Sequence, residues 1–276
     1  MIETQPKSEL AKGAGDENFP VASKLLPAWS RPHVMAYYAF ARAADDVADA
    51  ADLSAAKKLR SLWSMHEQLK IGTIEPSAKV YALHQSLNQT GVSFEHGQNL
   101  LEAFVWDVEH PRTADWDALI DYCALSAAPV GRYLIDLLGG CEGDYRASDA
   151  LCAALQILNH LQDLKDDLIE LDRIYVPLDW MVAAGIKEGD LIASSCTPAL
   201  RGVLDQMLDG VDALLEEAKP LPGAIHSKAL AREAGGILAI ARRLAKALRR
   251  QDPVAQRVEL SKPMMALCFV WGALNA

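Results

Sequence analysis

The sequence predicts an all-α protein, and three observations support this prediction. Hydrophobic residues make up 51% of the 276 residues, which is enough for a large buried core. Apolar residues recur at spacings of three and four along most of the chain, as in amphipathic helices. Runs of alternating β-branched residues, which would indicate strands, are weak. We therefore expect a single helical domain over residues 17–276 after a polar tail over residues 1–16.

The N-terminal half is expected to contain helices over three ranges: 31–50, 53–69 and 77–89. A fourth should begin at Ser93, because serine is a favourable N-cap residue. It should end at His110, because a residue that precedes a proline disfavours the helical conformation.

The C-terminal half begins with a helix expected over residues 114–138, closed by Gly139 and Gly140. Pro129 should bend this helix, either for packing alone or to open a cavity and bare carbonyl groups. Ser148 is expected to cap the next helix, which runs to about Leu171. Further helices are expected over residues 198–217, 226–249 and 263–272.

The charge balance bears on which partners the protein can have. The net charge is −10, from 37 acidic and 27 basic residues. Nucleic acid is not expected as a partner, because phosphate neutralisation needs clustered lysine and arginine.

The five cysteines form no CxxC pair, and we expect reduced thiols in a cytoplasmic protein without a secretory signal. The apolar run MMALCFVWGAL predicts a core helix, with a membrane-facing surface as the alternative.

Two expected helices each carry two aspartates one turn apart. Asp45 and Asp49 share a helical face with Tyr38 and Arg42, because their spacings are four, three and four. The second face has the same type of spacing and consists of Gln156, Asn159, Asp163 and Asp167. Either pair alone is typical of a solvated face. Two such faces on largely apolar, and therefore buried, helices predict carboxylates that line an interior cavity.

Carboxylates around a buried cavity favour hard cations such as Mg²⁺, which take oxygen ligands. The remaining coordination positions suit phosphate oxygens, and Arg42 and Arg173 supply forked donors for the same group. The pattern therefore indicates a diphosphate substrate with a hydrocarbon portion. A di-iron site would need Glu-x-x-His, which this chain lacks, and no nucleotide-binding glycine motif is found.

The segments ENFPVASKLLP, YAFARAADDVAD, AFVWDVE, DYCALSAAPVGRYL and LQILNHLQDLKDDLIELDRIYVP occur in this order. With these motifs the chain resembles the squalene/phytoene synthase family, over about residues 18–257. The SAAPVGRYL and NHLQDLKDD segments resemble its hydroxysqualene synthase branch in hopanoid biosynthesis. The resemblance implies a class I isoprenoid synthase bundle of helices around a central cavity.

The resemblance also implies roles for individual residues. Two or three Mg²⁺ ions would be held by Asp45, Asp49, Asn159, Asp163 and Asp167. The substrate would contact a further set: Asn18, Tyr38, Arg42, Asp107, Gln156, Arg173, Tyr175 and Arg257. Tyr122 would act near the reacting carbons. His160 was interpreted as structural, because it points about 100° away from Asn159 around the helix.

The expected reaction is conversion of presqualene diphosphate and water to hydroxysqualene and diphosphate, without NADPH. One alternative is head-to-head condensation of two prenyl diphosphates. Another is a non-catalytic helical scaffold for a partner synthase. Peripheral contact with the inner membrane and functional pairing with a presqualene diphosphate synthase are further expectations. Gln162 stands where the family carries arginine, and we hypothesise that this loss of a cation suits an enzyme with a single diphosphate substrate.

Overall fold

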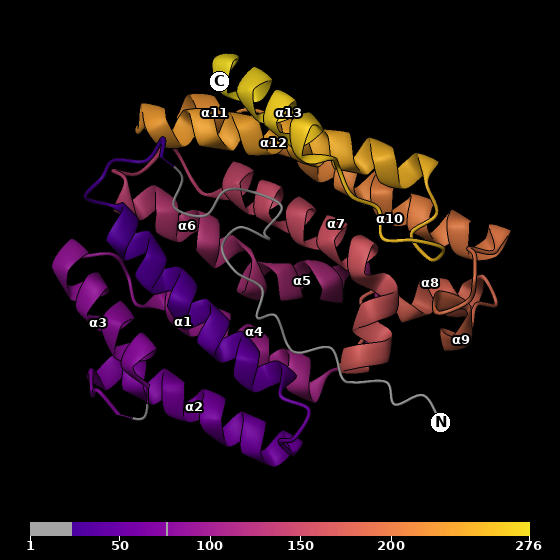
Figure 1. Ribbon diagram of the computed structural model, residues 1–276, viewed down its shortest axis with the longest axis horizontal. Coiled ribbons are helices and arrows are strands. Elements are labelled where there is room, and N and C mark those ends of the chain that lie inside the picture. Colours follow the sequence, from indigo (N-terminus) through magenta and orange to yellow (C-terminus); the bar gives the residue numbers. More distant parts are fainter. Residues whose placement is uncertain (1–23, 76) are drawn as a thin grey trace, which may run out of the picture.

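The computed structural model describes residues 24–75 and 77–276, so the predicted polar tail and Asn18 lie outside the described residues. The described part contains thirteen helices and no strand (Figure 1). They are α1 Arg31–Asp49, α2 Ala55–Ile71, α3 Ala78–Thr90, α4 Glu95–Glu109, α5 Trp116–Ser126, α6 Ala128–Leu137, α7 Arg146–Leu171, α8 Leu178–Ala183, α9 Glu188–Leu191, α10 Pro198–Glu217, α11 Leu221–Ala224, α12 Lys228–Arg250 and α13 Lys262–Leu274. The predicted all-α class is therefore confirmed.

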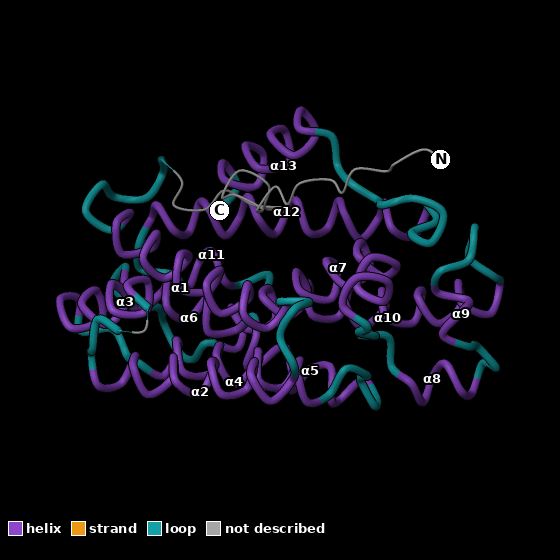
Figure 2. The backbone as a smooth tube through the Cα atoms, turned by 60° about the horizontal axis from the view of Figure 1, so that its bottom comes forward, coloured by secondary structure: helices purple, strands orange, loops and turns teal. Residues whose placement is uncertain are grey.

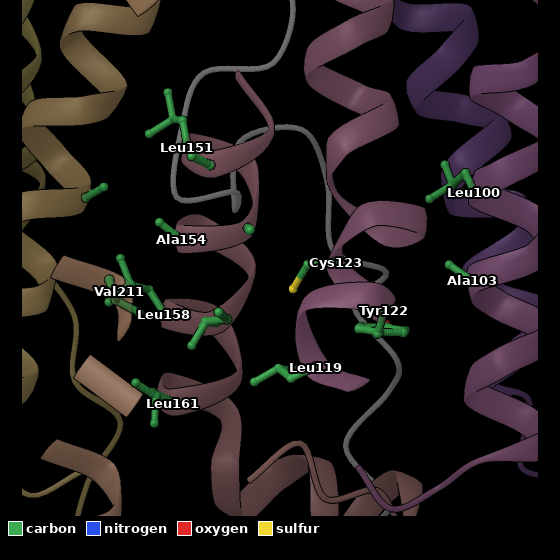
Figure 3. Packing of buried hydrophobic residues seen from close by; sticks show 14 of the residues in the cluster. Leu100, Ala103, Leu119, Tyr122, Cys123, Leu151, Ala154, Leu158, Leu161 and Val211 are labelled. Atoms are coloured by element: carbon green, nitrogen blue, oxygen red, sulfur yellow. The ribbon is translucent and has the colours of Figure 1, made fainter. Parts of the chain in front are cut away.

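Helix α7 is the central element of the bundle. It packs against α5, α6, α10 and α12, while α1 packs against α2, α3 and α4 on the other side of the molecule. Leu158 and Leu161 of α7 are almost completely buried, as is Val211 of α10 (Figure 3). Burial of such side chains stabilises the fold by about 1.5–3 kcal/mol each. This packing fixes one face of α7 against α10 and leaves another face for the site.

The start of α7 differs from the prediction that Ser148 caps it. The helix begins at Arg146, whose backbone amide donates to the Asp144 carboxylate at 3.1 Å. Ser148 is buried within the first turn. The helix ends at Leu171, and its C-cap residue, Asp172, adopts a left-handed conformation with φ 55°. This cap turns the chain so that the Arg173 amide donates to the Asp167 carbonyl at 3.0 Å.

The helix predicted over residues 114–138 is divided into α5 and α6. The division falls at Ala127, and Pro129 lies in the first turn of α6. Proline lacks the amide that would donate a hydrogen bond to the Leu125 carbonyl, and its ring would clash with the preceding turn of a continuous helix. The expected bend is therefore a complete break, and residues on both sides of it line the cavity described below.

The prediction that residues 263–272 form a core helix was wrong in its burial. Helix α13 lies outermost, beyond α12 (Figure 2), and Gly272 is its only buried residue. Helix α13 packs closely on α12 because both helices have glycine at the crossing. A Cβ atom at Gly272 would lie only 2.1 Å from the Gly235 carbonyl oxygen. Among residues 24–75 and 77–276, no helix has the length and apolar character needed to span a bilayer.

Candidate active site

A cavity of about 470 Å³ lies inside the bundle, between α1, α4, α5, α6, α7 and α12. The lining changes in character along α7. Leu151 and Leu155, near the start of the helix, give an apolar wall, whereas Asp163 and Asp167, near its end, give an acidic one. The acidic end of α1, with Asp45 and Asp49, lines the same cavity. One end of the cavity therefore suits a charged group and the other a hydrocarbon.

The acidic face of α1 is paired with two arginines. Arg42 donates to Asp45 at 2.5 Å, one turn away on the same helix. Arg173 donates to the Asp49 carboxylate at 2.8 Å and to the Ala48 carbonyl at 3.2 Å. Arg173 is buried and comes from the turn after α7. Its contacts with the end of α1 join the two acidic helices at one end of the cavity.

The acidic face of α7 has a third arginine. Arg257, from the segment between α12 and α13, forms an ion pair with Asp163. The neighbouring Gln162 is buried, and its amide donates to the Val258 carbonyl at 2.7 Å. Gln162 does not line the cavity. It contacts the segment that carries Arg257, so we expect any effect of residue 162 on a diphosphate to pass through Arg257.

Three polar residues form a buried cluster in the cavity wall. The Asp107 carboxylate on α4 accepts hydrogen bonds from the Tyr122 hydroxyl at 3.0 Å and the Tyr175 hydroxyl at 2.8 Å. Burial raises the pKa of Asp107, and the positive charge of Arg173 and the two hydroxyl donors oppose this rise. The cluster thus places polar atoms in the cavity wall close to Arg173 and His160, next to the charged end.

The structure brings the predicted site residues together. The cavity is lined by all of those within the described part of the chain: Tyr38, Arg42, Asp45, Asp49, Asp107, Tyr122, Gln156, Asn159, Asp163, Asp167, Arg173, Tyr175 and Arg257. Asn18 lies outside the described residues. Helical spacing predicted the two acidic faces, but the arginines that meet Asp49 and Asp163 come from distant segments.

His160 and Glu233 line the cavity as well. The sequence prediction interpreted His160 as structural and did not include Glu233. The His160 ring stacks on Tyr175 with centroids 3.5 Å apart, and its Nδ1 lies 3.6 Å from the Asp167 carboxylate. The spacing along α7 did not place His160 in the cavity wall. Its ring lies there beside Tyr175, which comes from the segment after α7. Glu233, on α12, is a buried acid that follows the exposed Arg232.

The electrostatic environment of Asp45 differs from that of an exposed aspartate. Burial raises its pKa from 3.8 to about 6, and the neighbouring Asp49 carboxylate adds to the rise. Arg42 opposes the rise by favouring the ionised form. A cation that binds between the acidic faces would favour ionised Asp45 in the same way, so proton and cation compete for this carboxylate.

The donor set fits Mg²⁺, because the two faces present carboxylate and amide oxygens without a thiolate. In the described part of the chain, no three Asp, Glu, His or Cys side chains form a ready-made site for one ion. Asp45, Asp49 and Asp163 are instead paired with arginines, and Asp167 lies beside His160. This arrangement is consistent with ions that bind together with a diphosphate, whose oxygens complete the coordination and draw the arginines away from the carboxylates.

Comparisons with solved structures agree with this architecture. The squalene synthase HpnC from Alicyclobacillus acidocaldarius has a TM-score of 0.73 and 31% sequence identity, over 84% of this chain and 87% of that one. A dehydrosqualene synthase solved with a ligand has a TM-score of 0.78 at 21% identity, which shows the shared fold. The predicted isoprenoid synthase bundle is therefore confirmed.

Comparisons of sequence are more specific. Hydroxysqualene synthase of Zymomonas mobilis is 40% identical over 95% of this chain and 89% of its own length. Hydroxysqualene synthase of Rhodopseudomonas palustris is 39% identical over 98% and 92%, respectively. The family model for squalene/phytoene synthase matches residues 13–264, which include both acidic faces and all three arginines that pair with them. With this match over nearly its whole length, the chain belongs to the squalene/phytoene synthase family.

Proposed function

We propose that this enzyme converts presqualene diphosphate and water to hydroxysqualene and diphosphate, as a carbon–oxygen lyase. The observation that carries the proposal is the polarity of the cavity: two acidic faces with three arginines at one end, and an apolar wall at the other. The similarity to relatives named hydroxysqualene synthase supports this choice among the reactions of the family.

The charged end would bind the diphosphate and promote its departure. Arg42, Arg173 and Arg257 would turn from the aspartates to the diphosphate oxygens, where their forked donors stabilise the charge that develops as the carbon–oxygen bond breaks. Asp45, Asp49, Asn159, Asp163 and Asp167 would hold two or three Mg²⁺ ions. When bound, Mg²⁺ supplies Lewis-acid stabilisation of the leaving diphosphate. The bonding electron pair leaves with the diphosphate.

The apolar portion would hold the hydrocarbon and steady the resulting cation. The wall contains aromatic residues, among them Phe104 and Tyr133, and aromatic rings stabilise cations that lie against their faces. The buried cluster of Asp107, Tyr122 and Tyr175 would hold one water molecule beside the cation and exclude water elsewhere. Attack by this water forms the new carbon–oxygen bond, and its proton passes to the solvent or the diphosphate. No hydride is transferred, so NADPH is not required.

An incubation with alternative substrates tests the proposed reaction. Purified enzyme with Mg²⁺ receives presqualene diphosphate or farnesyl diphosphate, each with and without NADPH. We expect hydroxysqualene from presqualene diphosphate only, and no effect of NADPH. Presqualene diphosphate or squalene formed from farnesyl diphosphate would contradict the proposal and identify a condensing enzyme. If the proposed reaction holds, an enzyme that condenses two prenyl diphosphates must supply the substrate.

Neutral variants test whether the acidic faces are catalytic or the chain is a scaffold. Asp45→Asn and Asp163→Asn should each lower kcat by about 100-fold or more, because each removes a carboxylate that would hold the Mg²⁺ ions on which the leaving diphosphate depends. Asp166→Asn is a matched control on the outer face of α7, where the side chain is exposed. Equal activity of all three variants would favour the scaffold.

A further inference from the structure

Helix α13 presents an apolar outer face that nothing in the described chain covers. Leu267, Val270, Trp271 and Leu274 are 54–80% exposed and lie at spacings of three and four, so they form one stripe along the helix. Helix α13 contains no acidic residue, and Lys262 at its start is its only charged residue. Exposed apolar stripes of this kind indicate an interaction surface, because monomers rarely leave large apolar patches in water.

Basic residues of α12 flank this stripe on the same outer face. Five are exposed and fall within an arc of about 60° around the helix, given about 100° per residue: Lys228, Arg232, Arg243, Lys246 and Arg250. None of the five forms an ion pair within residues 24–75 and 77–276. The one acidic residue of α12, Glu233, is buried on the cavity side. The face is therefore locally positive although the chain has a net charge of −10.

The crossing of the two helices places the stripe among these cations. A Cβ atom at Gly272 of α13 would lie 2.9 Å from the Cβ atom of Ala239, and one at Gly236 would meet the Phe269 ring at 2.5 Å. Gly236 and Ala239 lie on α12 between Arg232 and Arg243. Helix α13 thus crosses α12 (Figure 2) between the positions of Arg232 and Arg243, so basic residues precede and follow the crossing along α12.

We propose that this face, made of the apolar stripe of α13 and the basic residues of α12, docks the protein on the surface of an anionic phospholipid bilayer. Leucine, valine and tryptophan side chains would enter the interface between headgroups and acyl chains, while lysines and arginines contact the anionic headgroups. A second copy of the chain is a poorer occupant. An isologous dimer would oppose the same face to itself and bring two sets of cations together.

The position of the cavity agrees with a lipid surface rather than a protein partner. Leu230, Ala234 and Ile237 line the apolar part of the cavity from the opposite side of α12. The apolar part of the cavity therefore faces the same side of the molecule as the docking face, with α12 and α13 between it and the stripe. The docking itself does not depend on which prenyl diphosphate the enzyme uses, and it can be measured without substrate.

Vesicle co-sedimentation of the full-length protein tests the proposal. Vesicles of phosphatidylcholine alone are compared with vesicles of equal parts phosphatidylcholine and phosphatidylglycerol. We expect binding to the mixed vesicles that weakens with salt, and much weaker binding to the neutral ones. Arg243→Gln with Lys246→Gln should lower the partition coefficient by about tenfold or more. Leu267→Glu with Trp271→Glu should abolish binding, because it places charges within the apolar stripe.

Matched controls separate this face from a general effect of charge or apolar surface. Val182→Glu changes an exposed apolar residue on α8, and Lys57→Gln with Arg60→Gln removes two exposed cations from α2. Both controls should bind as the wild type does. The proposal is overturned if the protein does not bind mixed vesicles, or if the controls lose as much binding as the test variants. Dimerisation that Leu267→Glu abolishes, without vesicle binding, would overturn it in favour of a second copy.

Discussion

Asp45 illustrates how burial sets the behaviour of a single carboxyl group. Its pKa is raised to about 6 in the folded protein, whereas an aspartate in an unfolded chain has a pKa near 3.8. At a pH between these two values, Asp45 therefore remains protonated in the folded state, whereas it has lost its proton in the unfolded state. This proton favours folding at low pH, and the advantage is lost as the pH rises through about 6.

Asp45→Asn should remove this pH dependence, because asparagine does not ionise. Without Mg²⁺, the stability of the variant relative to the wild type should increase between pH 4 and pH 7, by on the order of 2 kcal/mol. Urea unfolding in the presence of a chelator, at several pH values, measures the difference. A stability difference that stays constant across this range would show that Asp45 titrates normally.

Gln162 acts on the site through a backbone contact. Its amide donates to the Val258 carbonyl, which holds the segment that carries Arg257. Gln162→Leu should therefore weaken the binding of inorganic diphosphate with Mg²⁺ by about three- to tenfold, comparable to the loss of one hydrogen bond. Isothermal titration of both single variants and the double variant with Arg257→Gln measures the coupling.

The two changes should not be additive if Gln162 acts by positioning Arg257. Once Arg257 is replaced, Gln162→Leu should have little further effect on diphosphate binding. Full additivity would instead show that Gln162 affects the diphosphate independently of this arginine.

At the level of elements, breaks and crossings were harder to predict than helices. Spacing of apolar residues predicted α1, α4, α7 and α10 closely, since these helices bury a broad face. Pro129 was recognised, but its effect was a complete break between α5 and α6 rather than a bend. The composition of α13 left two outcomes open, a core helix or a surface helix, because an apolar helix can be covered on all sides or on one side alone; the structure shows the second.

The crossing of α12 and α13 depends on such a small residue. Gly272→Ala should destabilise the docking of α13, because the new Cβ would lie 2.1 Å from the Gly235 carbonyl oxygen, which is backbone and cannot swing aside. Limited proteolysis should then cleave the segment between α12 and α13 faster than in the wild type. Gly202→Ala is the matched control: it lies on α10, exposed and with open space around it, and should be neutral or slightly stabilising. Equal cleavage rates in the two variants would contradict the close crossing.

At the level of the whole molecule, the sequence could predict which residues form the site but not how they pair. The two acidic faces followed from helical spacing, and the family resemblance added Asp107, Tyr175 and Arg257. The pairing of Arg173 with Asp49 and of Arg257 with Asp163 joins residues more than ninety positions apart. Such contacts depend on the packing of the bundle, which local periodicity does not encode.

On the proposed function, the charged end of the cavity would release diphosphate, and the apolar part would protect a cation until one water molecule reacts. The measurement that tests this account most directly is the reaction of presqualene diphosphate in water enriched in a heavy oxygen isotope. We expect hydroxysqualene whose hydroxyl group carries the isotope, together with unlabelled diphosphate. An unlabelled alcohol, label in the released diphosphate, or squalene as the only product would contradict the capture of a carbocation by water in this cavity.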